Sequence, residues 1–276
     1  MFDRRSFLLA GAASGALAPL LARAASADPA GALDALLASF AQADLVRSPQ
    51  EATSLGLDVG ALAPQRSRLA ASSLAAFARD KADIAERVAR LKTIDRAALG
   101  GMAAVNYDTV AYVYEGEAEA NRLFDYGGTG AGRPYVISQL TGVYQSVPDF
   151  LDTHHPIETP ADAEAYLDRL GAFASVMDHE REVARHDAAL GTIPPDFILE
   201  RTLGQMRKLA GTPADSSILV ASLARRAALK NIPGDWRARA AAIYEKTVLP
   251  AVGRQIELVD GWRAGASRDA GVWRLK

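Results

Sequence analysis

The chain has 276 residues, a net charge of −2, 49% hydrophobic residues and no cysteine. This composition can bury the core of one large domain or two small ones, and it excludes a disordered chain, a disulfide framework and cysteine-based catalysis or zinc binding. Basic residues are spread among acidic ones, so the sequence has no basic face and nucleic acid is not an expected partner.

Residues 1–27 have the pattern of a twin-arginine signal peptide. Arg4 and Arg5 stand in Asp-Arg-Arg-Ser-Phe-Leu-Leu, an Ala/Gly-rich run follows, and residues 25–27 offer a small-x-small cleavage site. The apolar run is too short and too rich in glycine to anchor in a bilayer, so we expect no stable membrane span in the mature chain. The pattern predicts a periplasmic or secreted protein whose mature part, residues 28–276, is a helical domain.

Helical spacing and helix punctuation dominate the first half of this domain. Ser48 and Pro49 are typical of a helix start, and Glu51 is placed to complete a capping box with Ser48. Gly100-Gly101 is expected to break or soften a helix that Asp95 caps. Residues 57–66 and the glycine-rich residues 127–134 are expected to be loops. The expected helices span residues 32–45, 49–56, 69–91 and 96–124.

The strongest helix signal lies in the second half. Thr159 is a suitable cap, Pro160 occupies the first helical position, and apolar residues then recur at steps of three and four until Gly191. Such a helix has about 30 residues and a length of roughly 45 Å. Further helices are expected from residue 196, over 214–229 and over 235–265, the last one kinked or broken by Pro250. The pattern predicts an all-α, multi-helix bundle of long amphipathic helices.

All four histidines fall between residues 154 and 186. His179, Glu182 and His186 share one helix face, but the two imidazoles are about 10 Å apart along the axis, which is too far for one zinc ion. The His-Glu-x-x-His pattern fails because Val183 occupies the second histidine position. We expect a solvated face there, no metal site, and no carboxylate in an apolar setting. With no Gly-x-Ser-x-Gly motif either, the chain has no complete catalytic site.

Several stretches together resemble the domain-of-unknown-function 885 family over most of residues 45 to 276. They are Ser48-Pro49-x-x-Ala52-Thr53-x-x-Gly56, Gln139-Leu140-Thr141-Gly142-Val143, Val147-Pro148-Asp149-Phe150-Leu151, Ala161-Asp162-Ala163-Glu164-Ala165-Tyr166-Leu167-x-Arg169-Leu170 and Gly191-x-x-Pro194-Pro195-x-Phe197-Ile198-Leu199.

The resemblance implies an exported helical protein of the zinc-peptidase type. Family members are about twice as long as this chain, and their His-Glu-x-x-His motif lies in the carboxy-terminal half. No histidine follows His186, so the resemblance implies that this chain is the amino-terminal part of a larger helical zinc-peptidase-like fold. Zinc is expected for full-length members and not here. Residues 271–276 resemble the family's Gly-x-Trp-x-Leu-Pro segment with Lys276 in place of proline, which is the pattern of a truncated reading.

Two functional hypotheses follow. In the first, the chain is the substrate-covering half of an exported zinc metallopeptidase-like hydrolase, inactive alone, that binds a peptide substrate together with a missing carboxy-terminal half. Its cleft-lining candidates are Gln139, Thr141, Tyr144 and His155. In the second, the chain is a free-standing periplasmic helical module that binds peptide or a partner protein in a groove.

Overall fold

The structure is a computed structural model that describes residues 28–127 and 134–275. The expected signal peptide, residues 1–27, and most of the glycine-rich loop lie outside the described residues. The described residues form α-helices with short 3-10 and π segments, and contain no strand, which confirms the predicted all-α class. None of the described helices is long and apolar enough to cross a membrane.

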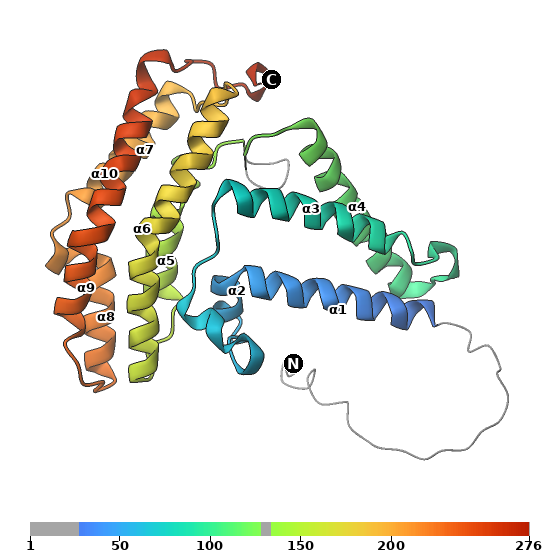
Figure 1. Ribbon diagram of the computed structural model, residues 1–276, viewed down its shortest axis with the longest axis horizontal. Helices are drawn as coiled ribbons and strands as arrows, with labels where there is room; N and C mark the ends of the chain where they lie inside the picture. The colour runs from blue at the N-terminus through green and yellow to red at the C-terminus, as the bar shows by residue number, and fades with distance from the viewer. Residues whose placement is uncertain (1–27, 128–133, 276) are drawn as a thin grey trace.

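The first half of the chain forms a unit that we call the arm, residues 29–123. In it α3 packs against α4, and α1 contacts both (Figure 1). Its apolar core cluster is small: it consists of the buried residues Leu33, Leu91 and Leu99, and the apolar side chains packed against them are only partly buried. The elements of the arm are α1 (Pro29–Arg47), α2 (Pro49–Ser54), the 3-10 helix η1 (Gly60–Ser67), α3 (Leu74–Leu91), the 3-10 turn η2 (Arg96–Ala98) and α4 (Gly101–Leu123).

Several helix and loop boundaries in the arm differ from those that the sequence predicts. Ser48 precedes α2 but its side chain makes no cap hydrogen bond, so the expected capping box with Glu51 is not formed. The stretch expected to be a loop contains η1. The helix expected from residue 69 begins at Leu74, because the Ser73 hydroxyl accepts the Ala76 N–H at 3.2 Å and so caps α3 there.

The second half forms the body, residues 143–261, in which helices surround α6 (Figure 1). One large core cluster joins its helices, with residues such as Tyr166, Leu170 and Leu203 almost wholly buried. The elements of the body are α5 (Val143–Thr153), α6 (Pro160–Ala189), α7 (Asp196–Ala210), the 3-10 turn η3 (Ala214–Ser216), α8 (Ile218–Leu229), α9 (Trp236–Ile243), the π segment η4 (Tyr244–Val248) and α10 (Leu249–Gly261), followed by the 3-10 turns η5 (Arg263–Gly265) and η6 (Val272–Arg274).

The central helix α6 begins where the sequence predicts. The Asp162 N–H donates to the Thr159 hydroxyl at 3.2 Å, and the Thr159 N–H donates to the Asp162 carboxylate at 2.8 Å. These reciprocal bonds form a capping box. Gly191 follows the helix with φ +86°, a left-handed conformation that glycine adopts without a steric penalty.

The break expected at Pro250 is a change of helix type. Five residues, Tyr244–Val248, form a π segment between α9 and α10, and Pro250 lies in the first turn of α10. Proline has no N–H to continue the α-helical ladder, and the wider π turn absorbs that missing bond without ending the helical path.

Candidate functional site

Residues 134–142 carry most of the cleft candidates. The segment contains no helix, and Ile137 fixes it in the core of the body with 2% of its surface exposed. On one side it lies against the end of α6, and on the other against the start of α7. It therefore bridges two helices whose positions are set by the main core.

A tight turn closes the segment at residues 138–141. The Ser138 N–H donates to the Thr141 carbonyl at 3.1 Å. The Thr141 hydroxyl donates to the Tyr135 carbonyl at 2.8 Å, so in the 2.7 Å contact between the two hydroxyls Ser138 must be the donor. The Ser138 oxygen in turn accepts the N–H groups of Leu140 and Thr141. Both hydroxyls are used to hold the turn, and neither is free to act as a nucleophile.

Tyr144 fastens this turn to the body. Its buried hydroxyl lies 2.8 Å from the Ser138 carbonyl and 2.6 Å from Oε1 of Gln205 in α7, and it accepts the Gln145 side-chain N–H at 2.9 Å. Burial and the nearby Glu180 carboxyl raise the pKa of Tyr144, so the phenol keeps its proton. Tyr144 therefore lies beneath the turn and sets its position.

Glu180 caps α5 from another helix. Gly142 precedes α5 and has no side chain to offer, and the Glu180 carboxyl accepts the Val143 N–H at 2.9 Å and the Gln255 side-chain N–H at 3.0 Å. Burial raises the pKa of Glu180 to about 8, against the opposing effect of these two hydrogen bonds. The expectation that α6 shows a solvated face here, with no carboxylate in an apolar setting, is wrong for this residue. The sequence does contain a signal for this burial, because Glu180 follows Phe173 and Met177 at the helical spacing of the buried face.

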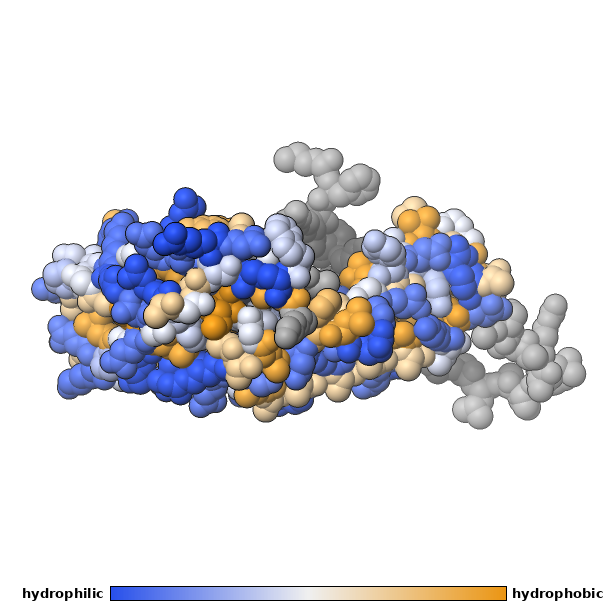
Figure 2. All heavy atoms as spheres, turned by 90° about the horizontal axis from the view of Figure 1, so that it is seen from above, coloured by the Kyte–Doolittle hydropathy of each residue, from blue (hydrophilic) through white to orange (hydrophobic). Residues whose placement is uncertain are grey.

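The cleft candidates Gln139 and Thr141 line a surface hollow of about 400 Å³. Arg274 donates to the Tyr135 hydroxyl at 2.9 Å and so holds the C-terminal segment beside it. This end of the body exposes large apolar side chains, with Leu140 82% and Trp273 79% exposed. Figure 2 looks down on this end of the molecule, where hydrophobic residues appear among charged ones near the centre of the face. The described residues that line the hollow are Pro134, Tyr135, Ser138, Gln139, Leu140, Thr141 and Ile198.

This lining is suited to binding and not to catalysis. Among the described residues around the hollow there is no carboxylate, imidazole or amine that could transfer a proton near neutral pH. The volume is within the range of small-ligand pockets, and the lining combines apolar surface with amide and main-chain groups.

His155 lies apart from the other three candidates. It is fully buried just beyond the end of α5, an 11-residue helix whose first turn carries Tyr144, so about 16 Å of helix separates them. Its Nδ1 accepts a hydrogen bond from Arg169 at 2.7 Å, so its Nε2 carries the proton and donates to the Asp162 carbonyl at 2.9 Å. Burial lowers the pKa of His155 to about 4, and the nearby guanidinium groups of Arg169 and Arg226 add to this effect.

Arg169, the partner of His155, joins the body to the arm. Its guanidinium is buried in α6 and donates to the carbonyls of Arg68 and Gln65 and to the Thr53 hydroxyl, at 2.9, 2.8 and 2.7 Å. Burial lowers the pKa of Arg169 to about 10, which still leaves it charged at neutral pH. In this structure His155 is part of a structural joint, and it does not line the hollow with Gln139 and Thr141.

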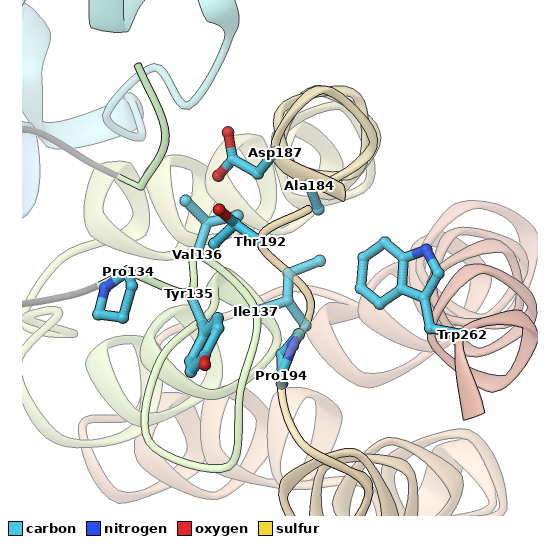
Figure 3. Close-up of a pocket in the computed structure, with 9 residues that line it drawn as sticks. All are labelled: Pro134, Tyr135, Val136, Ile137, Ala184, Asp187, Thr192, Pro194 and Trp262. Carbon is cyan, nitrogen blue, oxygen red and sulfur yellow. The ribbon is translucent and has the colours of Figure 1, made fainter. Parts of the chain in front are cut away.

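A second, much smaller hollow lies on the other side of residues 134–137. Figure 3 shows Asp187 of α6 and Trp262 at the end of α10 approaching this segment from different helices. The Asp187 carboxylate accepts the Gly127 N–H at 3.0 Å, and burial raises its pKa. The volume is only about 10 Å³, little more than the space for one water molecule. This hollow is too small for a substrate.

The described residues contain no group of three or more histidine or acidic side chains arranged to hold a metal ion. The His186 ring lies 3.1 Å from the Asp187 carboxylate and 3.6 Å from that of Asp125. His179, Glu182 and His186 are not part of any such group among the described residues.

Comparisons with known proteins place this fold in a family. The chain is similar to a protein of known crystal structure described as "the putative lipoprotein from Colwellia psychrerythraea", with 17% identity and a TM-score of 0.79. The match covers 90% of this chain and 44% of that protein, so the chain spans less than half of its length. No curated protein matches the chain. The profile of the family described as "Bacterial protein of unknown function (DUF885)" matches residues 49–272, and the chain therefore belongs to this family.

Proposed function

We propose that this chain is the substrate-covering helical part of an exported zinc metallopeptidase-like protein, and that it binds peptide without cleaving it. The observation that carries the proposal is the hollow beside residues 138–141, which has the size and lining of a binding surface and lacks proton-transferring groups. Catalytic zinc ligands would come from a region other than this chain. Gln139 and Thr141 would contact the peptide, and Tyr144 would hold the turn that carries them.

Two findings support a role as part of a larger protein. The similar Colwellia protein is more than twice as long as the matched region, so the same helical fold occurs there with a large additional part. The end of the body that bears the hollow also exposes Leu140 and Trp273, as a surface that meets another element would.

We further propose export through the twin-arginine route to the periplasm or beyond. The support is the sequence of residues 1–27, together with the description of the Colwellia protein as a lipoprotein, which is a class of exported protein. An Arg4→Lys, Arg5→Lys double variant is expected to stay in the cytoplasm, and the variant in the periplasmic fraction would contradict the route.

Peptide binding at the hollow is testable with fluorescently labelled peptides from a casein digest. Leu140→Asp places a charge beside the hollow and is expected to weaken binding. The matched control is Leu229→Asp, which makes the same change at a 74% exposed leucine on α8 and should leave binding unchanged. No binding, or equal binding by the two variants, would overturn the proposal.

The same purified chain should release no fragments from casein. Hydrolysis that stops when a chelator is added would show a complete metal site and contradict the covering role. The DNA beyond the codon for Lys276 separates the two sequence hypotheses. A continuation that encodes His-Glu-x-x-His supports the covering half, and a clean stop without such a sequence supports a free-standing binding module.

A further inference from the structure

The chain passes from η1 to α3 through residues 68–72 (Figure 1). A separate groove runs along this segment. These residues have no helix, turn or bend, and Arg68 has the extended angles φ −106° and ψ 155°. Two adjoining hollows of about 530 and 340 Å³ lie beside the segment and share Arg47, Ala71 and Asp80 in their linings. The groove shares no lining residue with the hollow at residues 134–141.

This segment has unpaired main-chain N–H groups. The Ala70 N–H donates to the side-chain oxygen of Gln50 in α2 at 2.9 Å. The N–H groups of Leu69 and Ala71 have no hydrogen-bond partner within the described part of the chain. These two N–H groups flank the Ala70 N–H, which Gln50 occupies. Both residues line the larger hollow. Unpaired N–H groups such as these can bond to the carbonyl groups of an added extended peptide.

The side chains at the larger hollow favour a carboxylate. Arg68 and Arg79 line it, and neither forms an ion pair with a described carboxylate, whereas Arg47 in the same lining is paired with Asp44 and Asp83. Guanidinium groups select carboxylates through charge-assisted hydrogen bonds.

The other groups of the groove orient the peptide. Gln65 lines the larger hollow, is only 5% exposed, and has a side-chain oxygen without a hydrogen-bond partner in the described structure, which suits a donor from a ligand. The smaller hollow carries Asp44, Asp80 and Glu117 together with Arg47 and Arg87. Asp80 lines both hollows. Only the smaller hollow adds Glu117, which has no ion pair among the described residues, and only the larger one adds the unpaired Arg68 and Arg79, so the carboxylate end belongs at Arg68 and Arg79.

We propose that this groove binds an extended peptide that pairs with the N–H groups of Leu69 and Ala71 and places a carboxylate against Arg68 and Arg79. The site goes beyond the proposed covering role, because it lies in the arm and uses a different ligand group. It stands or fails independently of the hollow at residues 134–141.

The test is a nuclear magnetic resonance titration of the full chain with a short N-acetylated alanine peptide. One form of the peptide ends in a free carboxylate and the other in an amide. The carboxylate form should shift the amide signals of residues 68–79, most strongly those of Leu69 and Ala71. The amide form should bind more weakly.

The double variant Arg68→Glu, Arg79→Glu should weaken binding of the carboxylate peptide by roughly tenfold or more, since it replaces two attractive charges by repulsive ones. Arg268→Glu is the matched control, a charge reversal at a side chain that is 94% exposed and outside the groove. Circular dichroism confirms that each variant is folded. The proposal is overturned by absence of shifts at residues 68–79 at millimolar peptide, by equal affinity of both peptide forms, or by the same shifts arising from self-association of the protein alone.

Discussion

The arm and the body use the same kind of amphipathic helix but bury it to different degrees. In the body, α6 is surrounded by α5, α8, α9 and α10, and its apolar stripe is almost fully enclosed. In the arm, α4 buries a single residue, Ala120, and leaves Met102, Val105 and Tyr112 exposed. Since most helical stability in proteins comes from packing, the body should be a stable unit by itself and the arm should open more readily.

The two units are joined by buried polar contacts more than by an apolar core. Arg169 connects α6 to the residues around α2 and η1, and Arg66 of the arm donates to Asp162 of the body at 2.8 Å. Such contacts hold a defined geometry, but one side chain, Arg169, donates to several buried acceptors at once. We therefore expect substitutions at the joint formed by Arg169 and its partners to lower the free energy of unfolding more than substitutions elsewhere.

The largest effect is expected for Arg169→Met. This change keeps much of the apolar stem but leaves several buried acceptors without a donor, each at a cost of about 1–3 kcal/mol, so we expect a loss of roughly 3–5 kcal/mol in the free energy of unfolding. Urea denaturation measures it. The control Arg207→Met removes a surface pair with Asp260 and should cost less than about 1 kcal/mol. Equal losses for the two variants would show that the joint is not a special site.

The body should also show a pH dependence near neutral pH that comes from Glu180. The pKa of Glu180 is about 8 in the folded chain against 4.5 for an ordinary glutamate. The folded state therefore holds a proton that the unfolded state has released, and stability falls as the pH rises from 4.5 towards 8. His155 acts in the opposite sense, because its folded pKa of about 4 is below the ordinary 6.5. Its contribution is complete above pH 6.5 and is lost as the pH falls towards 4.

Between pH 4.5 and 6.5 the effects of Glu180 and His155 on the free energy of unfolding oppose each other. Above pH 6.5 the effect of Glu180 is the larger of the two. We expect the free energy of unfolding to fall by about 2 kcal/mol between pH 6.5 and 8. In Glu180→Gln the side chain cannot ionise, and this fall should be absent. Urea denaturation of both proteins across that range is the measurement, and the same fall in the variant would assign it to another group.

The smallest predicted effect is the loss of a helix cap, and it distinguishes the local stability of the arm from the global stability of the body. Ser73→Ala removes the cap of α3, and Thr159→Ala removes the cap of α6, each at about 1 kcal/mol. Because α3 belongs to the arm, the first loss should appear only in the exchange of arm amides. The second should lower the free energy of global unfolding. A global loss of the same size for Ser73→Ala would mean that the arm and the body unfold together.

Local signals explain which elements the sequence predicts. The start of α6 depends on Thr159, Pro160 and Asp162, which are neighbours in the chain, and its end depends on Gly191. These signals act over a few residues and are readable without a fold. The break at Pro250 belongs to the same class, although the π segment that absorbs it could not be foreseen from the missing N–H alone.

The site could not be predicted from local patterns, because its side chains are positioned by residues far away in the sequence. Tyr144 depends on Gln205, 61 positions away, and Arg169 depends on Thr53, 116 positions away. Glu180 is a partial exception, because the spacing of the buried stripe includes it and only its polarity suggested exposure. The sequence predicts a helix from residue 69 because its amphipathic spacing continues to Leu91, but residues 69–73 are not helical and the Ser73 cap sets the start at Leu74.

Native-state hydrogen exchange of the full chain tests the comparison most directly. We predict that the most protected amides of α6, α7 and α10 exchange only through global unfolding, whereas those of α1, α3 and α4 exchange through a local opening of lower free energy. Equal opening free energies in the arm and the body, which change together with denaturant concentration, would contradict the inference that the arm opens more readily than the body.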